Sequence, residues 1–219
     1  MSEAYEVLKK YAKMMADLDY PVGSTAKIVI QTSGGIFATR DGADFSQLAH
    51  EDVQKLEMDR LPLPKADMRA MVYSSTPYCS RCLREAKPFR ASLDDMAQII
   101  GPEVYIVDGR SKNKDKAIGK SFKKALKNSV GCFVLTGIDS KGNGHGYTLT
   151  MGRTPYEAVV AMTVLEKSAE VMFMAEKLGG AKPLPRSEAI MMRAVYKKKY
   201  SKAEEEIKAQ EVEQSWSTD

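Results

Sequence analysis

Residues 152–184, GRTPYEAVVAMTVLEKSAEVMFMAEKLGGAKPL, contain the strongest structural signal in this chain. Thr154 is followed by Pro155 and then by Glu157, three residues after the threonine, which is typical of a capped helix start. Apolar residues then recur on one helical face, namely Ala158, Met162, Leu165, Ala169 and Met172. The glycine pair at 179–180 ends the pattern. The stretch predicts one long helix whose apolar face packs against another layer.

Upstream of this helix, helical and strand patterns alternate. A first helix is expected over residues 3–18, and the β-rich runs 27–31 and 35–39 predict a hairpin around Thr32-Ser33-Gly34. A short helix is expected within 41–57. Further strands are expected at 68–74, 104–107, 130–135 and 147–151. Further helices are expected over 78–100, with a break at Pro88, over 110–127, and in a long segment after Leu184. An extended connector at 61–64 and a flexible loop at 139–146 complete the pattern.

The composition fits a single soluble domain. The 219 residues are 43% hydrophobic and 28% charged, and no apolar run approaches the ~20 residues that cross a bilayer. The charged N-terminus lacks the apolar core of a secretory signal. Three cysteines do not form a disulfide framework, so a cytoplasmic location without membrane association is expected.

Positive charge gathers between Arg110 and Lys127, where eight basic residues accompany a single acidic one, Asp115. Ile118, Phe122 and Leu126 follow each other at four-residue steps, so one helix face is expected to be buried while the lysines line the other. We interpret the lysines as a solvated helix face. Nucleic-acid binding is not expected, because neither interleaved aromatic residues nor a recognisable module accompanies the charge.

Three segments in this order resemble the class II aldolase/adducin family: DFSQLAHEDV at 44–53, DMAQIIGPEV at 95–104, and 152–184. The resemblance covers roughly residues 3–185. It implies an α/β fold with three α/β/α layers around a central, mainly antiparallel sheet. The expected organisation is one aldolase-like domain over 1–185, followed by a C-terminal helix and charged tail over 186–219.

The resemblance also implies a zinc ion held by an H-x-H pair and a third, distant histidine. Tyr73 and Ser75 stand at the positions of the pair, and neither is a good zinc ligand at neutral pH. The chain has only two histidines, and His50 lies in a different segment. His145 matches the third position, but an apparent insertion at 139–144 leaves both a site role and an exposed loop position open. No metal and no other cofactor are expected.

The phosphate-binding segments implied by the family are altered as well. Ala26 and Lys27 replace a Gly-Asn pair, and Thr39-Arg40-Asp41-Gly42 replaces a Thr-Pro-Ser-Gly run. The family's Ser-Ser-Glu segment, with its acid/base glutamate, is missing. Asp41 would repel a phosphate, whereas Lys27 and Arg40 would attract one.

These losses lead to one preferred function and one alternative. The preferred function is non-catalytic or regulatory binding of a small anionic ligand or a partner, with the ligand held by Lys27, Arg40, Tyr73, Ser74 and Ser75. The alternative is a diverged lyase or isomerase acting on a small hydroxy-carbonyl compound. Its catalytic candidates are Tyr73, Lys27 and His145, and the tyrosine or lysine would need a pKa lowered by several units to act as a base.

Cys79-Ser80-Arg81-Cys82 adds a second alternative, a thiol redox protein. The pair is expected where a strand gives way to a helix, and a helix N-terminus can lower the pKa of a thiol. Two ordinary thiols one helical turn apart are the simpler interpretation. A structural zinc site would need two further ligands, with only Cys132 and a histidine available.

The resemblance finally implies a homo-oligomer, most simply a tetramer, because enzymes of this family build active sites at subunit boundaries. The segment from Ser187 to Tyr200 could reach a neighbouring subunit with Tyr196 or Tyr200.

Overall fold

The computed structural model describes residues 2–59, 61, 65, 67–87, 89–110 and 114–199, with the side chains of Ser2 and of 114–119 excepted. The charged tail at 200–219, including Tyr200, lies outside the described residues. So do positions 62–64 of the expected connector and the expected helix break at Pro88.

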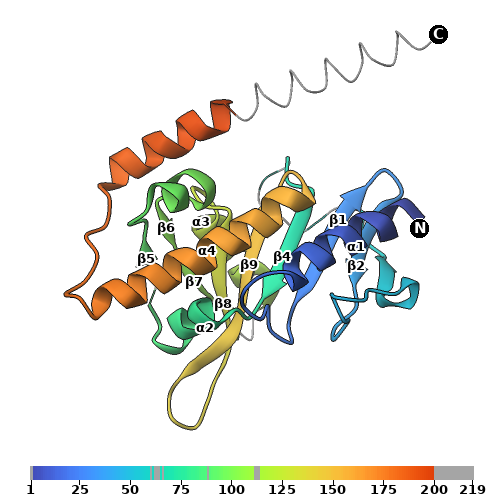
Figure 1. The fold of residues 1–219 in the computed structure, drawn as a ribbon, viewed down its shortest axis with the longest axis horizontal. Helices are drawn as coiled ribbons and strands as arrows, with labels where there is room; N and C mark the ends of the chain where they lie inside the picture. The colour runs from blue at the N-terminus through green and yellow to red at the C-terminus, as the bar shows by residue number, and fades with distance from the viewer. Residues whose placement is uncertain are drawn as a thin grey trace.

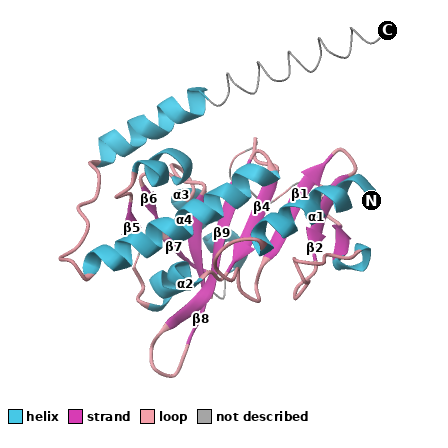
Figure 2. Cartoon of the chain, in the orientation of Figure 1, coloured by secondary structure: helices cyan, strands magenta, loops and turns pink. Residues whose placement is uncertain are grey.

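A seven-stranded sheet forms the centre of the molecule (Figures 1 and 2). Its strand order is β3-β2-β1-β4-β9-β8-β7, and every neighbouring pair is antiparallel except β7 with β8. The predicted central, mainly antiparallel sheet is therefore confirmed. The strands are β1 (Lys27–Thr32), β2 (Gly35–Thr39), β3 (Val53–Leu56), β4 (Ala70–Ser74), β7 (Ile106–Asp108), β8 (Gly131–Ile138) and β9 (Gly144–Gly152), with β5 (Phe89–Arg90) and β6 (Glu103–Val104) in a separate two-stranded sheet.

Helices pack on this sheet, and α1 and α4 lie side by side across one face of it (Figure 1). The short α2 packs against both β9 and α4, and α3 packs against β7. The helical elements are α1 (Ser2–Ala16), η1 (His50–Asp52), α2 (Pro77–Arg84), η2 (Met96–Ile100), α3 (Lys114–Ala125), α4 (Pro155–Glu176) and a final helix over residues 186–199.

Strand alternation decides which side chains face these helices. Ile28 and Ile30 of β1 are buried in one core cluster with Val72 of β4 and the apolar face of α1. The intervening Val29 and Met71 therefore point to the opposite face of the sheet, and both belong to a second cluster. The predicted 27–31/35–39 hairpin is confirmed, with Val29 opposite Ala38.

The helix predicted after Thr154 is also confirmed. The Thr154 hydroxyl accepts a hydrogen bond from the Glu157 amide at 3.2 Å, and Pro155 occupies the first turn. The expected inner face is buried from Ala158 to Ala169 and partly buried at Met172. In a capping box the carboxylate of Glu157 would accept a hydrogen bond from the amide of the cap residue Thr154. Here it accepts instead from the amide of Arg153, one residue earlier, at 2.8 Å.

Four expected elements differ from the structure. The strand expected over 104–107 is divided between β6 in the small sheet and β7 in the main sheet. The short helix expected within 41–57 is only the 3-10 turn η1, followed by strand β3, which pairs with β2. The helix expected over 78–100 is divided into α2, β5 and the π-helical η2. The loop expected at 139–146 is shorter, because β8 extends to Ile138 and β9 begins at Gly144.

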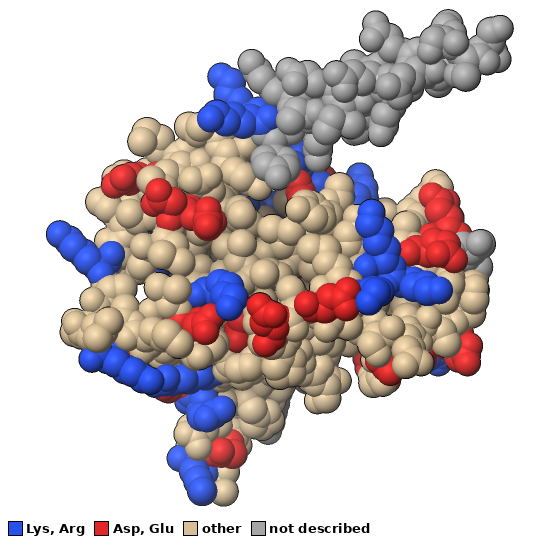
Figure 3. All heavy atoms as spheres, in the orientation of Figure 1, with Lys and Arg blue, Asp and Glu red and all other residues tan. Residues whose placement is uncertain are grey.

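The charged residues fit a solvated surface. The lysines of α3 that the structure describes, Lys120, Lys123 and Lys124, are exposed, whereas Leu126 in the following turn is buried. This agrees with the predicted helix that buries one face. The side chain of Ile118 is outside the described residues. Basic and acidic side chains are interspersed on the face shown in Figure 3. Among the described helices, none combines the length and the apolarity required to span a bilayer.

Two glycines give a matched test of backbone constraint. Gly101 has φ +133°, and a Cβ there would lie 2.2 Å from the Asn128 carbonyl oxygen, whereas Gly42 has φ +79° and open space around it. We expect Gly101→Ala to lower the free energy of unfolding by about 3 kcal/mol or more, because both the conformation and the contact are unfavourable. Gly42→Ala should cost only about 1–2 kcal/mol, from the left-handed backbone alone. Urea denaturation measures both, and equal losses would contradict this account.

Candidate functional site

Tyr73, near the carboxyl end of β4, stands at the centre of the candidate site. It lies opposite Lys27 of β1 on one side and Leu149 of β9 on the other. Its ring packs edge-on against Tyr147, with ring centroids 5.3 Å apart. Because Tyr73 alternates with Val72, it projects from the sheet face opposite α1.

A hollow of about 590 Å³ lies on that face. Apolar side chains supply most of its wall, and charge enters through one ion pair, in which the Lys27 Nζ lies 2.8 Å from the Asp41 carboxylate. The lysine side chain is 24% exposed and the aspartate 87% exposed, so the lysine belongs to the wall and the aspartate to the solvent-facing rim. The lining residues are Ser24, Thr25, Lys27, Val29, Asp41, Leu56, Met58, Met71, Tyr73 and Tyr147.

The structure separates the five residues expected to bind an anion. Lys27 and Tyr73 line the hollow, and Ser75 adjoins it through a hydrogen bond between its hydroxyl and that of Thr25. Ser74 is fully buried on the opposite face of the sheet, because its neighbour Tyr73 faces the hollow. Arg40 is exposed, and its Nε donates to the Glu51 carbonyl at 2.7 Å. Arg40 and Ser74 therefore do not line the hollow.

His145 lies in strand β9 rather than in a loop. Its ring lies across Gly137 of β8, where a Cβ would come within 2.4 Å of the imidazole. The residue of β9 opposite Tyr73 is Leu149, four residues beyond His145. At a rise of about 3.3 Å per strand residue, His145 therefore lies roughly 13 Å along β9 from the position opposite Tyr73. His145 is exposed and does not line the hollow.

Burial makes the tyrosines of the hollow poor bases. It raises the pKa of Tyr73 to about 12, with smaller contributions from Tyr147 and Cys132. Burial raises the pKa of Tyr147 as well. Both side chains are therefore neutral phenols near pH 7, able to donate a hydrogen bond but not to abstract a proton without a further change.

The zinc implied by the family resemblance does not fit the residues present. Tyr73 presents a neutral phenol, the Ser75 hydroxyl is already hydrogen-bonded to Thr25, and His145 is directed across Gly137. In the part of the chain that the structure describes, no cluster of three or more histidine, cysteine, aspartate or glutamate residues could hold a metal ion. A tetrahedral zinc site needs thiolate, imidazole or carboxylate ligands, and of these three positions only His145 supplies one, away from the other two along β9.

A buried carboxylate organises the chain just beyond the hollow. Glu166 of α4 is 1% exposed, and it accepts hydrogen bonds from the backbone amides of Tyr78 at 2.7 Å and Cys79 at 2.9 Å. These amides belong to the first turn of α2, where a negative charge is favourable. Glu166 is not among the site residues predicted from the sequence. Its signal was an acidic residue directly after Leu165 on the otherwise apolar helix face.

Glu166 also determines the environment of the two nearby thiols. Cys79 and Cys82 are both fully buried. Burial, followed by the charge of Glu166, raises the pKa of Cys79 well above its usual value and raises that of Cys82 to about 12. The helix N-terminus thus faces a carboxylate, and the effect expected at a redox-active cysteine is reversed.

Seven lining residues of the hollow are not among the site residues predicted from the sequence, namely Ser24, Thr25, Val29, Leu56, Met58, Met71 and Tyr147. Tyr147 alternates with the buried Thr148 on β9, so an alternation analysis could have found it once β9 was paired with β4. The positions of Leu56 and Met58 follow from strand β3, whereas the sequence predicts a short helix in this segment.

Comparison with known proteins supports the fold. No family model matches the sequence, and no curated protein matches it either. Among solved structures, an L-fuculose 1-phosphate aldolase superposes with a TM-score of 0.70 at 19% identity, over 90% of this chain and 97% of the other. The L-fuculose-1-phosphate aldolase from Thermus thermophilus gives 0.62 at 16% identity, over 84% and 100%.

An aldolase II superfamily protein from Pseudomonas syringae gives a TM-score of 0.57 at 14% identity, over 88% of this chain and 84% of the other. These likenesses extend along most of each chain, at identities that support an inference about the fold and not about the reaction. The chain has a class II aldolase-like α/β fold.

Proposed function

We propose that this aldolase-fold protein binds a small organic anion in the hollow beside β1 and β4 and does not cleave it. The observation that carries the proposal is the pairing of Lys27 with Tyr73 across β1 and β4, at the edge of a largely apolar cavity. A cation and a phenol hydroxyl can both donate to one carboxylate or phosphate group. The apolar wall would then contact the body of the ligand.

Binding is favoured over turnover because none of the three catalytic candidates is a ready base in the hollow, and the one carboxylate among its lining residues, Asp41, is 87% exposed and paired with Lys27. Tyr73 has a raised pKa, Lys27 is held in an ion pair, and the third catalytic candidate, His145, lies elsewhere on β9. General base catalysis works best when the pKa of the base is near the working pH. A diverged lyase or isomerase would need a rearrangement that brings such a group to the ligand.

Lys27 and Asp41 provide opposite tests of ligand binding. In calorimetric titrations with a panel of hydroxy acids and hydroxy-carbonyl phosphates, Lys27→Met should weaken binding about tenfold, because one charge-assisted contact is lost. Asp41→Asn should strengthen binding, since it removes a competing carboxylate without disturbing a buried group. Lys55→Met on β3 is the control, because this exposed lysine does not line the hollow.

The same panel separates a binding protein from an enzyme. We expect no cleavage or isomerisation products by mass spectrometry. Turnover that Tyr73→Phe or Lys27→Met abolishes would establish the lyase or isomerase alternative instead. Equal affinities in Lys27→Met and Lys55→Met would place any binding outside this hollow.

The redox alternative has its own prediction. Because both thiols are fully buried and their pKa values are raised, native Cys79 and Cys82 should react with iodoacetamide at pH 7.5 at least about a hundredfold more slowly than in urea. Peptide mass spectrometry after timed alkylation measures both rates. Fast alkylation of either cysteine in the native protein would support a redox role.

We also propose a homo-oligomer, with a tetramer as the simplest assembly. The final helix exposes Met191, Val195 and Ile190, with 61%, 51% and 42% of their surfaces accessible, and association would cover such a face. Tyr196 contributes to a pocket on its own chain rather than extending outward. Light scattering should give four times the 24.2 kDa chain mass at micromolar concentration. A clean monomer would contradict the proposal.

A further inference from the structure

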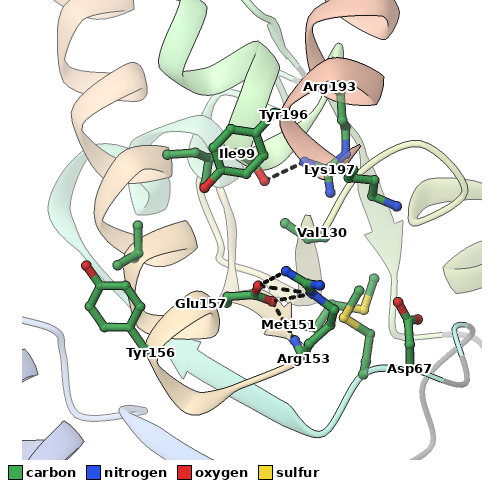
Figure 4. A pocket seen from close by; sticks show the side chains of 12 residues that line it. Asp67, Ile99, Val130, Met151, Arg153, Tyr156, Glu157, Arg193, Tyr196 and Lys197 are labelled. Carbon is green, nitrogen blue, oxygen red and sulfur yellow. Dashed lines mark hydrogen bonds and ion pairs between the residues drawn. The ribbon is translucent and has the colours of Figure 1, made fainter. Parts of the chain in front are cut away.

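A second pocket, of about 300 Å³, lies at the other end of β4 (Figure 4). It is formed where the helix over 186–199 crosses the end of β9 and the first turns of α4. Met68, just before β4, lines this pocket, and Tyr73 lines the hollow described above. The two cavities share no lining residue, although Met71 of the hollow pairs with Met151 of the pocket across β4 and β9.

Arg193 is the most constrained charged group of this pocket. Its side chain comes from the final helix, and the residue is only 8% exposed. One guanidinium nitrogen donates to the carbonyls of Gln98 at 2.8 Å and Ile99 at 2.6 Å, which cap the end of η2. Burial lowers the pKa of Arg193 to about 10, so the charge is held at a cost in solvation.

Among the residues that the structure describes, basic side chains outnumber acidic ones around Arg193. Arg153 is neutralised by its ion pair with Glu157 across one turn of α4. Lys197, on the final helix, and Lys65 lie near Arg193, and Asp67 is the facing carboxylate. Burial lowers the pKa of Lys65 to about 8, and repulsion from Arg193 and Lys197 contributes to this shift. The pKa of Lys197 is also lowered, mainly by burial and secondly by repulsion from Arg193. A bound anion would relieve this repulsion.

The remaining walls suit an apolar group. Figure 4 shows the rings of Tyr156 and Tyr196 on two sides of the opening, with Val130 between the guanidinium groups of Arg153 and Arg193. Aromatic rings supply a large contact area at a small cost in conformational entropy. A bare inorganic ion would contact the cations but leave these walls unused.

We infer that this pocket is a binding site for a small amphipathic anion, in which a phosphate or carboxylate group carries an aromatic or branched apolar body. The anionic group would lie between Arg193 and Lys197, and the body would lie against the two tyrosines. The inference depends on this cavity alone and is independent of the function proposed for the hollow at Lys27.

Phenyl phosphate is a suitable probe, because it combines a doubly charged group with one ring. Titrations use the full chain carrying Lys27→Met, so that anion binding in the other hollow is suppressed. We expect calorimetry to find one site per chain with a dissociation constant of about 1 mM or lower. Inorganic phosphate should bind more weakly and benzyl alcohol not measurably, since each lacks one of the two parts.

Lys197→Met should weaken phenyl phosphate binding about tenfold or more, through loss of a charge-assisted contact. The matched control is Lys198→Met, which alters the next residue of the same helix, an exposed lysine that does not line the pocket. Arg193 is left intact, because its removal would leave two buried carbonyls without a donor. Absence of binding by phenyl phosphate, or equal affinities in the two lysine variants, would overturn the inference.

Discussion

The carboxylate of Glu166 accepts hydrogen bonds from the amides of Tyr78 and Cys79, and this contact joins the long helix α4 to the chain that leaves β4. Each hydrogen bond to a buried charge contributes about 1.5–3 kcal/mol, and an unpaired carboxylate there would be strongly unfavourable. The orientation of α2 therefore depends on α4, and so does the position of the strand end that carries Tyr73 and Ser75.

The same contact contributes to the raised pKa values of the two cysteines of α2. A helix N-terminus ordinarily stabilises a thiolate, but here Glu166 occupies that position and supplies the negative charge itself. The backbone amides of Tyr78 and Cys79 in the first turn of α2 thus have the Glu166 carboxylate as their hydrogen-bond acceptor. Its role is to connect α2 with α4, and the thiols at 79 and 82 fill the space between them as small apolar groups.

Strand β4 connects two cavities with different chemistry. The hollow at its carboxyl end is mostly apolar, with Lys27 compensated by Asp41. Among the described residues, the pocket at its amino end has more basic than acidic side chains around Arg193, which comes from the final helix. The anion-binding roles that we propose for the two cavities rest on these side chains, whereas the likeness to an L-fuculose 1-phosphate aldolase supports the fold alone.

The sequence by itself determined the elements whose signals are local. The capped start at Thr154, the period of α4 and the β1–β2 hairpin follow from neighbouring residues. The fold itself was predicted from the resemblance of segments 44–53, 95–104 and 152–184 to the class II aldolase/adducin family. Tertiary structure decided what depends on distant partners. Residues 53–56 form a strand because β2 offers an unpaired edge, and Arg193 comes near Lys65 only after the final helix packs against η2. Hydrogen bonding and charge between remote segments override local propensity at these positions.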